Sequence, residues 1–153
     1  MPGPSERNRL TPLGKLDTVR RYSGLDEMAA RILVVDDDES LRELLRMHLA
    51  AAGYEVSTAP DGISAGYQVL KNPPDLILSD VDMPHMDGFE FVAALKSDPT
   101  LPDIPVIFLT SMEEGDHRGK ELGAVGYLTK PVRADRLLEM IALHVPGGAI
   151  PIG

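Results

Sequence analysis

The stretch "RILVVDDDES", residues 31–40, places four strongly apolar residues directly before three aspartates and a glutamate. The apolar run Ile32–Val35 is mostly β-branched, which is typical of a buried strand. Leucines follow at helical spacing, and Gly53 is the stop signal for that helix; these leucines are Leu41, Leu44, Leu45 and Leu49. The stretch therefore predicts a strand and then a helix, with carboxylates crowded into the connection.

The same unit of a strand followed by a helix occurs five times along the chain. The predicted strands are Ile32–Val35, Tyr54–Thr58, Leu76–Leu78, Val106–Leu109 and Val125–Leu128. The helices that follow them hold Leu41 to Leu49, Ile63–Lys71, then Phe89, Val92 and Leu95, then Glu113–Leu122, and finally Leu137, Leu138 and Ile141. Strict alternation with short connections predicts an α/β fold, a five-stranded parallel sheet with helices on both faces. The flavodoxin-like order 2-1-3-4-5 is the common solution at this size.

Composition limits the classes of function that the chain can have. Its 153 residues, 43% of them hydrophobic, are enough for one domain with a single sizeable core. Residues 32–153 hold nine Lys/Arg against twenty Asp/Glu, which argues against direct nucleic-acid binding. The chain has no cysteine, no signal-peptide core and no apolar run of the roughly 20 residues needed to cross a bilayer. We therefore expect a cytoplasmic protein that binds neither nucleic acid nor membrane.

Polar side chains gather where four of the predicted strands end. In a sheet of this kind, ligands bind beyond the carboxyl ends of the strands, near the switch point between strands 1 and 3. The residues at these ends are Asp36 and Asp37, Ser79 and Asp80, Thr110 and Ser111, and Thr129 and Lys130. The order of strands thus predicts three carboxylates, four hydroxyls and one ammonium group at one rim.

This set of groups favours phosphoryl transfer. Three carboxylates repel one another, and a hard divalent cation such as Mg²⁺ relieves the repulsion while leaving positions open for phosphate oxygens. A lysine and a hydroxyl can bind further phosphate oxygens, and a carboxylate can itself attack a phosphoryl group to give an aspartyl phosphate.

Four motifs at these positions resemble the receiver domain of bacterial response regulators. They are "VVDDD", "ILSDVDMPHMDG", "IFLTS" and "GYLTKP", and the resemblance covers residues 30–146. It implies that Asp80 is the phosphoacceptor and that Mg²⁺, or Mn²⁺ in its place, is held by Asp36, Asp37, Asp80 and the backbone carbonyl of Asp82. It also implies that Lys130, Thr110 and Ser111 bind the phosphoryl group, that Tyr127 turns inward when Thr110 moves, and that the bond before Pro131 is cis.

Two positions depart from the family pattern or modify the site. Asp82, two residues after the acceptor, is often Asn or Met in the family, and its charge is expected to repel an incoming phosphodonor or a hydrolytic water. Met112 is apolar and is expected to shield the phosphoryl group. Both residues therefore favour a slow autodephosphorylation.

The resemblance also implies a role in two-component signalling. A sensor histidine kinase or a histidine phosphotransfer protein would be the donor, and a separate protein would read the face formed by helix 113–122, the fifth strand and the last helix. A phosphorylation-dependent homodimer is a further state that the family allows. We expect residues 1–29 to form a flexible arm or a short helix marked by Leu13, Leu16 and Val19, and residues 147–153 to form a short tail with no output domain.

Other interpretations of the same residues remain open. The aspartates could only cap the first helix, although Ser40 to Glu43 already resembles a capping box. Asp80 and Asp82 resemble the paired aspartates of Mg²⁺-dependent haloacid dehalogenase phosphohydrolases, but those enzymes place the pair on the first strand. A phosphorylation-independent interaction module is a third alternative, which the complete set of acidic residues and lysine disfavours. The four histidines show no ligand spacing.

Overall fold

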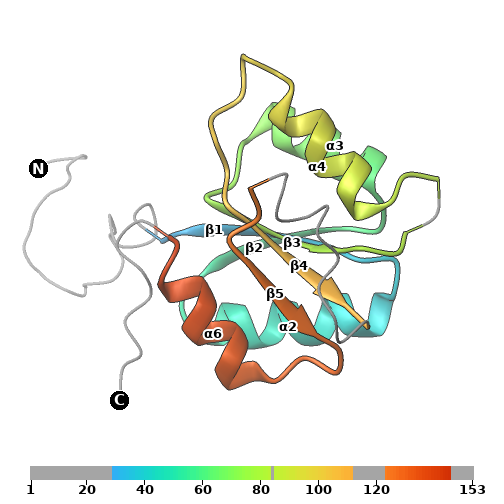
Figure 1. Ribbon diagram of the computed structural model, residues 1–153. Coiled ribbons are helices and arrows are strands. Elements are labelled where there is room, and N and C mark those ends of the chain that lie inside the picture. Colours follow the sequence, from blue (N-terminus) through green and yellow to red (C-terminus); the bar gives the residue numbers. More distant parts are fainter. Residues whose placement is uncertain (1–28, 84, 112–122, 146–153) are drawn as a thin grey trace, which may run out of the picture.

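A computed structural model describes residues 29–83, 85–111 and 123–145 (Figure 1). The strands are β1 (Arg31–Val35), β2 (Glu55–Ala59), β3 (Leu76–Asp80), β4 (Val106–Thr110) and β5 (Gly126–Thr129). The helices are α2 (Glu39–Ala51), α3 (Gly62–Lys71), α4 (Gly88–Lys96) and α6 (Ala134–Ala142). The predicted helix Glu113–Leu122, Met112, the arm up to residue 28 and the tail from residue 146 lie outside the described residues.

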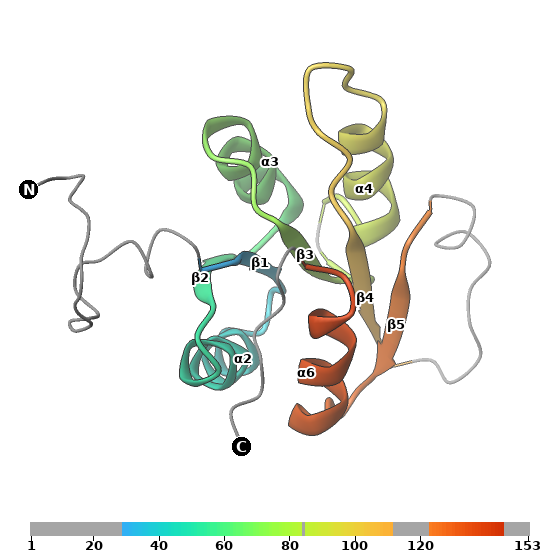
Figure 2. The same ribbon diagram turned by 90° about the vertical axis from the view of Figure 1, so that its left-hand side faces the viewer.

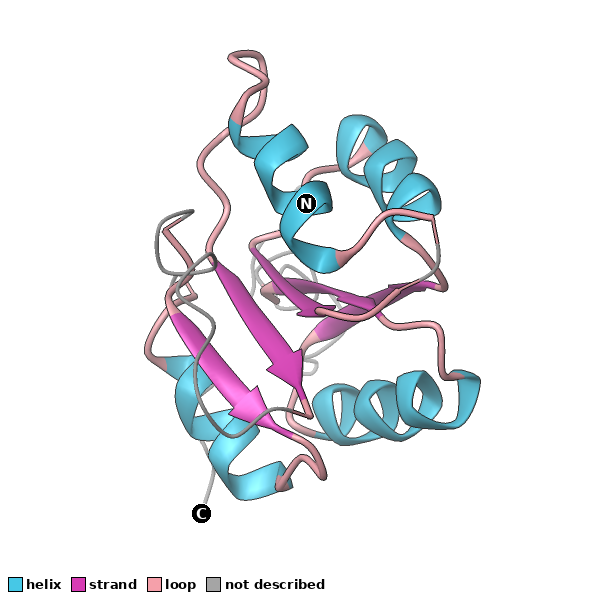
Figure 3. Cartoon of the chain, turned by 45° about the vertical axis from the view of Figure 1, so that its right-hand side comes forward, coloured by secondary structure: helices cyan, strands magenta, loops and turns pink. Residues whose placement is uncertain are grey.

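The five strands form one parallel sheet in the order β2-β1-β3-β4-β5, which confirms the predicted fold class (Figure 3). Every pairing between neighbouring strands is parallel. Residues of β3 and β4 are all buried, as expected for strands covered on both faces. Each strand begins and ends within a few residues of its predicted bounds.

Among the described helices, α3 and α4 cover one face of the sheet, and α2 and α6 cover the other (Figure 2). Alternate residues of a strand point to opposite faces. In β1, Leu33 and Val35 therefore join the core beneath α3 and α4, and Ile32 and Val34 join the core beneath α2 and α6. The sheet is thus held between two apolar layers, and only its strand ends are left to carry polar chemistry.

Aspartates are the N-cap residues of three of the described helices. The side chains of Asp38, Asp61 and Asp87 accept hydrogen bonds from the backbone N–H groups of the first turns of α2, α3 and α4. The predicted capping box at Ser40 is wrong, because α2 already begins at Glu39 with Asp38 as its N-cap. A reciprocal capping box is formed instead by Asp87 and Glu90 at the start of α4.

Candidate functional site

Strand order and register bring the predicted site residues to one rim. In the β1–β3 pair Val35 lies opposite Ser79, so the next residues, Asp36 and Asp80, leave the sheet side by side. On the far side of β3, Asp80 lies opposite Leu109, and Thr110 follows one residue later. Thr110 in turn lies opposite Thr129, and its carbonyl accepts a hydrogen bond from the Lys130 N–H at 2.8 Å.

Three carboxylates form a compact acidic cluster at this rim. Asp36, Asp37 and Asp80 each offer a carboxylate oxygen, and these atoms all lie within 4.8 Å of one another. Asp36 is fully buried and Asp80 is 4% exposed, whereas Asp37 faces solvent. Two carboxylates of the cluster are therefore buried, and the third is open to water.

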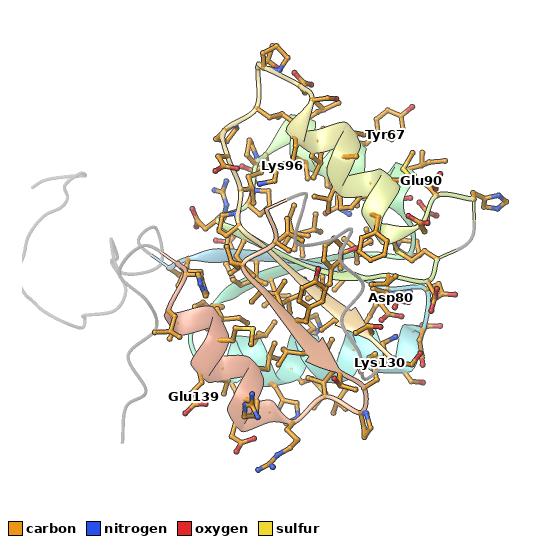
Figure 4. All side chains as sticks on the ribbon, in the orientation of Figure 1. Tyr67, Asp80, Glu90, Lys96, Lys130 and Glu139 are labelled. Carbon is orange, nitrogen blue, oxygen red and sulfur yellow. The ribbon has the colours of Figure 1, made fainter. Side chains whose placement is uncertain are left out.

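Lys130 is the cation of the cluster. Its Nζ lies 3.1 Å from Asp36 Oδ2 and 3.2 Å from Asp80 Oδ1. Figure 4 shows the side chains of Asp80 and Lys130 at the same end of the sheet. The peptide bond between Lys130 and Pro131 is cis, as the resemblance implies. One ammonium group thus contacts both buried carboxylates.

The charges of the cluster shift the pKa values of its members. Burial, and after it the negative charge of Asp36, raises the pKa of the Asp80 carboxyl to about 6, although Lys130 acts in the opposite direction. Burial alone would lower the pKa of Lys130, but its hydrogen bond to Asp36 and the charges of Asp36 and Asp80 raise that pKa. The cluster therefore lacks positive charge, because one cation faces two buried carboxylates.

The donors around the acidic cluster leave one oxygen poorly satisfied. Asp36 Oδ1 accepts a hydrogen bond from the Asp38 N–H at 2.9 Å, and Asp80 Oδ1 is 3.3 Å from the Asp82 N–H. Asp36 Oδ2 is buried and accepts no hydrogen bond of regular geometry, although the Lys130 ammonium is close. An additional hard cation would satisfy this oxygen, so the residues present fit Mg²⁺.

The third aspartate of "DDD" has a different task from the first two. The Asp38 side chain accepts a hydrogen bond from the Leu41 N–H at 3.2 Å, so it caps α2 and is outside the acidic cluster. The capping interpretation is therefore correct for one aspartate of the three, and the other two belong to the cluster.

Two residues that support the site were not predicted from the sequence. The Arg42 Nη1 donates a 2.7 Å hydrogen bond to the Asp36 carbonyl, which fixes the turn that leaves β1. Gly88 lies against the backbone at the end of β3, where an added Cβ would be 2.2 Å from the Asp80 carbonyl oxygen. The only sequence signal for these contacts is weak, namely an arginine one turn into a helix and a glycine after an aspartate.

The remaining predicted residues lie around the acidic cluster. Thr110 is 5% exposed at the end of β4, and Ser111 is exposed directly after it. Tyr127 packs on the side of α3 and α4, where its ring centroid is 5.8 Å from that of Phe108. Asp82 is exposed beside Asp80, and Met112 lies outside the described residues.

A surface hollow of about 520 Å³ lies away from this rim. Its lining comes from segments that precede β3 and β4 and from the end of α6, including Pro73, Ile104 and Val145. It therefore lies at the amino ends of the strands, opposite the acidic cluster. The cluster itself lies at the carboxyl ends of the strands with Asp37 open to solvent, which suits a group presented by another molecule better than an enclosed metabolite.

Comparisons with known proteins agree with this geometry. Residues 32–142 match the family model described as the response regulator receiver domain. The response regulator PleD of Caulobacter vibrioides is 50% identical over 107 residues, which are 69% of this chain and 24% of PleD. The response regulator MprA of a Mycobacterium species is 42% identical over 113 residues, 72% of this chain and 48% of MprA. The chain thus spans about a quarter to a half of these curated relatives.

Solved structures of similar chains are matched over most of their length. The chemotaxis response regulator CheY4 of Vibrio cholerae is 38% identical, with a TM-score of 0.73 over 77% of this chain and 100% of that one. A receiver domain of a histidine kinase from Syntrophus aciditrophicus is 37% identical, with a TM-score of 0.66 over 72% of this chain and 86% of that one. No helix among the described residues is long and apolar enough to span a bilayer.

Proposed function

The chain belongs to the response regulator receiver domain family of two-component signalling, and on that premise we propose that it is a phosphoacceptor switch in which Asp80 receives the phosphoryl group. The observation that carries the assignment to Asp80 is its position, 4% exposed at the end of β3 between Asp36 and Lys130. Lys130 contacts both Asp36 and Asp80, and of these two carboxylates Asp80 is the one on the central strand, β3.

The proposed chemistry is a single displacement at phosphorus. One carboxylate oxygen of Asp80 attacks the phosphorus atom of a phosphohistidine, the P–N bond breaks with its electron pair going to the imidazole nitrogen, and that nitrogen takes up a proton from solvent. The attacking carboxylate must be ionised, and with a pKa of about 6 it is largely ionised at neutral pH. A donor histidine needs a shallow, open rim, which the exposed side of Asp37 supplies.

Metal binding belongs to the proposal. Asp36, Asp37, Asp80 and the backbone carbonyl of Asp82 would hold Mg²⁺, or Mn²⁺ in its place. When bound, the ion supplies positive charge to the phosphoryl oxygens and orients them for in-line attack. Arg42 and Gly88 position the residues of this set, since one holds the Asp36 carbonyl and the other admits close packing on the Asp80 backbone.

The remaining polar residues would bind and report the phosphoryl group. In the proposal, the Lys130 ammonium moves from Asp80 to a phosphoryl oxygen, and the Thr110 hydroxyl and Ser111 bind the others. Tyr127 then turns inward beside Phe108. A partner protein would read the altered face formed by residues 113–122, β5 and α6, and the proposal includes a phosphorylation-dependent homodimer.

Partners and lifetime follow from this chemistry. A sensor histidine kinase or a histidine phosphotransfer protein would supply the phosphoryl group, and the chain would catalyse only its own phosphorylation and dephosphorylation. The charge of Asp82, which is exposed beside Asp80, and the apolar side chain of Met112, two residues after Thr110 in the sequence, would both favour slow hydrolysis because they disfavour an attacking water. We expect no turnover of free phosphate esters, which distinguishes the switch from a haloacid dehalogenase-type hydrolase.

The proposal is tested by intact mass after incubation with acetyl phosphate and Mg²⁺. Wild type should gain the mass of one phosphoryl group, and Asp80→Asn or a chelator should abolish the gain. Asp103→Asn is the matched control, because Asp103 is an aspartate with a side chain 90% exposed that pairs with Lys96 far from the rim. Equal labelling of wild type and Asp80→Asn would refute the assignment, as would labelling that ignores the chelator.

A further inference from the structure

Helix α3 carries an apolar stripe on the side that faces away from the sheet. Ile63, Tyr67 and Leu70 are 52%, 71% and 58% exposed, and their spacing of four and three residues places them on one helix face. Ala65 and Val69, which face the sheet, are fully buried. Figure 4 shows the Tyr67 side chain pointing outward from the layer of α3 and α4. We call Ile63, Tyr67 and Leu70 the α3 stripe.

The α3 stripe has no task in the fold or in the proposed phosphoryl chemistry. Single exposed apolar residues are ordinary, but three large ones in register on one short helix form a contiguous surface. Since the inner face of α3 already supplies its core contacts, the outer residues add nothing to the packing of the sheet. A surface of this kind indicates that another segment covers it.

The N-terminal arm enters the domain beside the end of the α3 stripe. Arg31, the first residue of β1, donates from its guanidinium to the Pro73 carbonyl at 2.9 Å and to the Asn72 side chain. Asn72 is the C-cap of α3, two residues after Leu70. The chain that precedes Ala29 therefore starts from the Leu70 end of the α3 stripe.

The arm has the composition to cover such a surface. Leu13, Leu16 and Val19 recur every three residues, so a helix over this segment would gather them on one face. Residues 1–21 hold five Lys/Arg against two Asp/Glu, whereas the body is acidic. Three carboxylates lie at the Ile63 end of the α3 stripe, where Gly62 packs against α4; they belong to Asp61, Asp87 and Glu90.

We propose that residues 13–19 of the arm dock along the α3 stripe of the same chain. The arm would run in the same direction as α3, with Val19 near Leu70 and Leu13 near Ile63. This direction brings the basic residues Arg7 and Arg9 towards the acidic end. The α3 stripe is about 10.5 Å long at 1.5 Å per residue, and helical residues 13–19 extend over about 9 Å. Residues 20–28 reach about 30 Å when extended, which is ample.

Paired cysteines test the docking directly, because the natural chain has none. We expect the variant with Leu16→Cys and Tyr67→Cys to form a disulfide within one chain under mild copper–phenanthroline oxidation, since docking brings these Cα atoms within about 7 Å. The matched control combines Leu16→Cys with Met47→Cys, which is 55% exposed on α2 and lies on the other face of the sheet. At least tenfold slower crosslinking of the control supports the proposal.

Two results of the crosslinking would overturn it. Equal rates for both pairs would mean that the arm has no preferred position. Crosslinks between chains only, seen as dimers on a non-reducing gel, would mean that the arm of a second copy covers the α3 stripe.

An independent readout uses proteolysis of the full chain. Docking should protect the trypsin site at Lys15, which lies inside the docked segment, and replacing Tyr67 and Leu70 together by Ser should make cleavage there about tenfold faster, equivalent to ~1.4 kcal/mol. Both side chains are more than half exposed, so the substitution leaves the folded core intact. The same change at Leu44 and Met47 of α2 is the control, and an unchanged rate in the α3 variant would contradict the proposal.

Discussion

Replacing Asp80 by Asn is expected to stabilise the metal-free protein even though it removes the proposed acceptor. The Asp80 carboxyl has a pKa of about 6 in the folded chain against an ordinary value of 3.8, so it binds its proton more tightly when folded. The free energy of unfolding therefore falls as pH rises through this range, and the full penalty is present above pH 6. Asn has the shape of the carboxyl without its charge, so it removes the penalty.

The size of the effect follows from the shift. About two pKa units at ~1.4 kcal/mol each give a ceiling of about 3 kcal/mol, and relaxation around Asp80 reduces the expected gain to about 1–2 kcal/mol at pH 7.5. The gain should fall to about a third of that value at pH 4.5, where the wild-type carboxyl is largely protonated in the folded state.

The assay is urea unfolding of both proteins in EDTA at several pH values. The difference in unfolding free energy between wild type and Asp80→Asn at each pH reports the titration of Asp80, because the other carboxylates titrate in both proteins. Asp103→Asn, at an exposed position far from the acidic cluster, should change the stability by less than about 0.5 kcal/mol. A destabilised Asp80→Asn, or a gain that persists unchanged at pH 4.5, would refute the electrostatic reasoning.

Further substitutions separate the roles of neighbouring residues. Mg²⁺ at ten times its dissociation constant should stabilise wild type by ~1.4 kcal/mol, and this gain, followed by thermal unfolding, should be much smaller for Asp37→Ala. Asp38→Ala should instead cost about 1 kcal/mol through the lost cap of α2 and leave the Mg²⁺ affinity, measured by calorimetry, nearly unchanged. Gly88→Ala should lower the free energy of unfolding by about 1–3 kcal/mol and slow the gain of the phosphoryl group, because the added Cβ would meet the Asp80 carbonyl. Gly66→Ala, which has open space around it, should be neutral or stabilising in the same urea assay. Lys130→Met should raise the pKa of Asp80 above about 6, because the Lys130 ammonium lowers it in the wild type. An NMR titration of the Asp80 carboxyl measures this pKa, and an unchanged value would contradict the prediction.

The sequence was most informative where one physical signal dominated. The apolar runs at β1, β3 and β4 are buried on both faces, and this burial fixes both their strand character and their central positions. Once the strands are ordered, the residues that follow them meet at one rim without further information. Asp36, Asp80 and Lys130 could therefore be brought together from their places along the chain alone.

Prediction failed where neighbouring residues compete for the same task. Asp38 and Ser40 are both good N-cap residues, and only the turn held by the Asp38 N–H and the Asp36 carboxylate decides between them. The close approach of Gly88 to the Asp80 backbone depends on the path of a loop, which no local pattern encodes. The hydrogen bond from Arg42 likewise depends on how α2 packs against the end of β1.

The most direct test of the central claim locates the phosphoryl group on the chain. After labelling with acetyl phosphate and Mg²⁺, borohydride reduction converts an aspartyl phosphate to homoserine, and peptide mass mapping then identifies the modified position. We predict a single homoserine, at position 80, which disappears when Mg²⁺ is chelated. Homoserine at Asp36, Asp37 or Asp82 with position 80 unmodified would contradict the assignment of Asp80 as the phosphoacceptor.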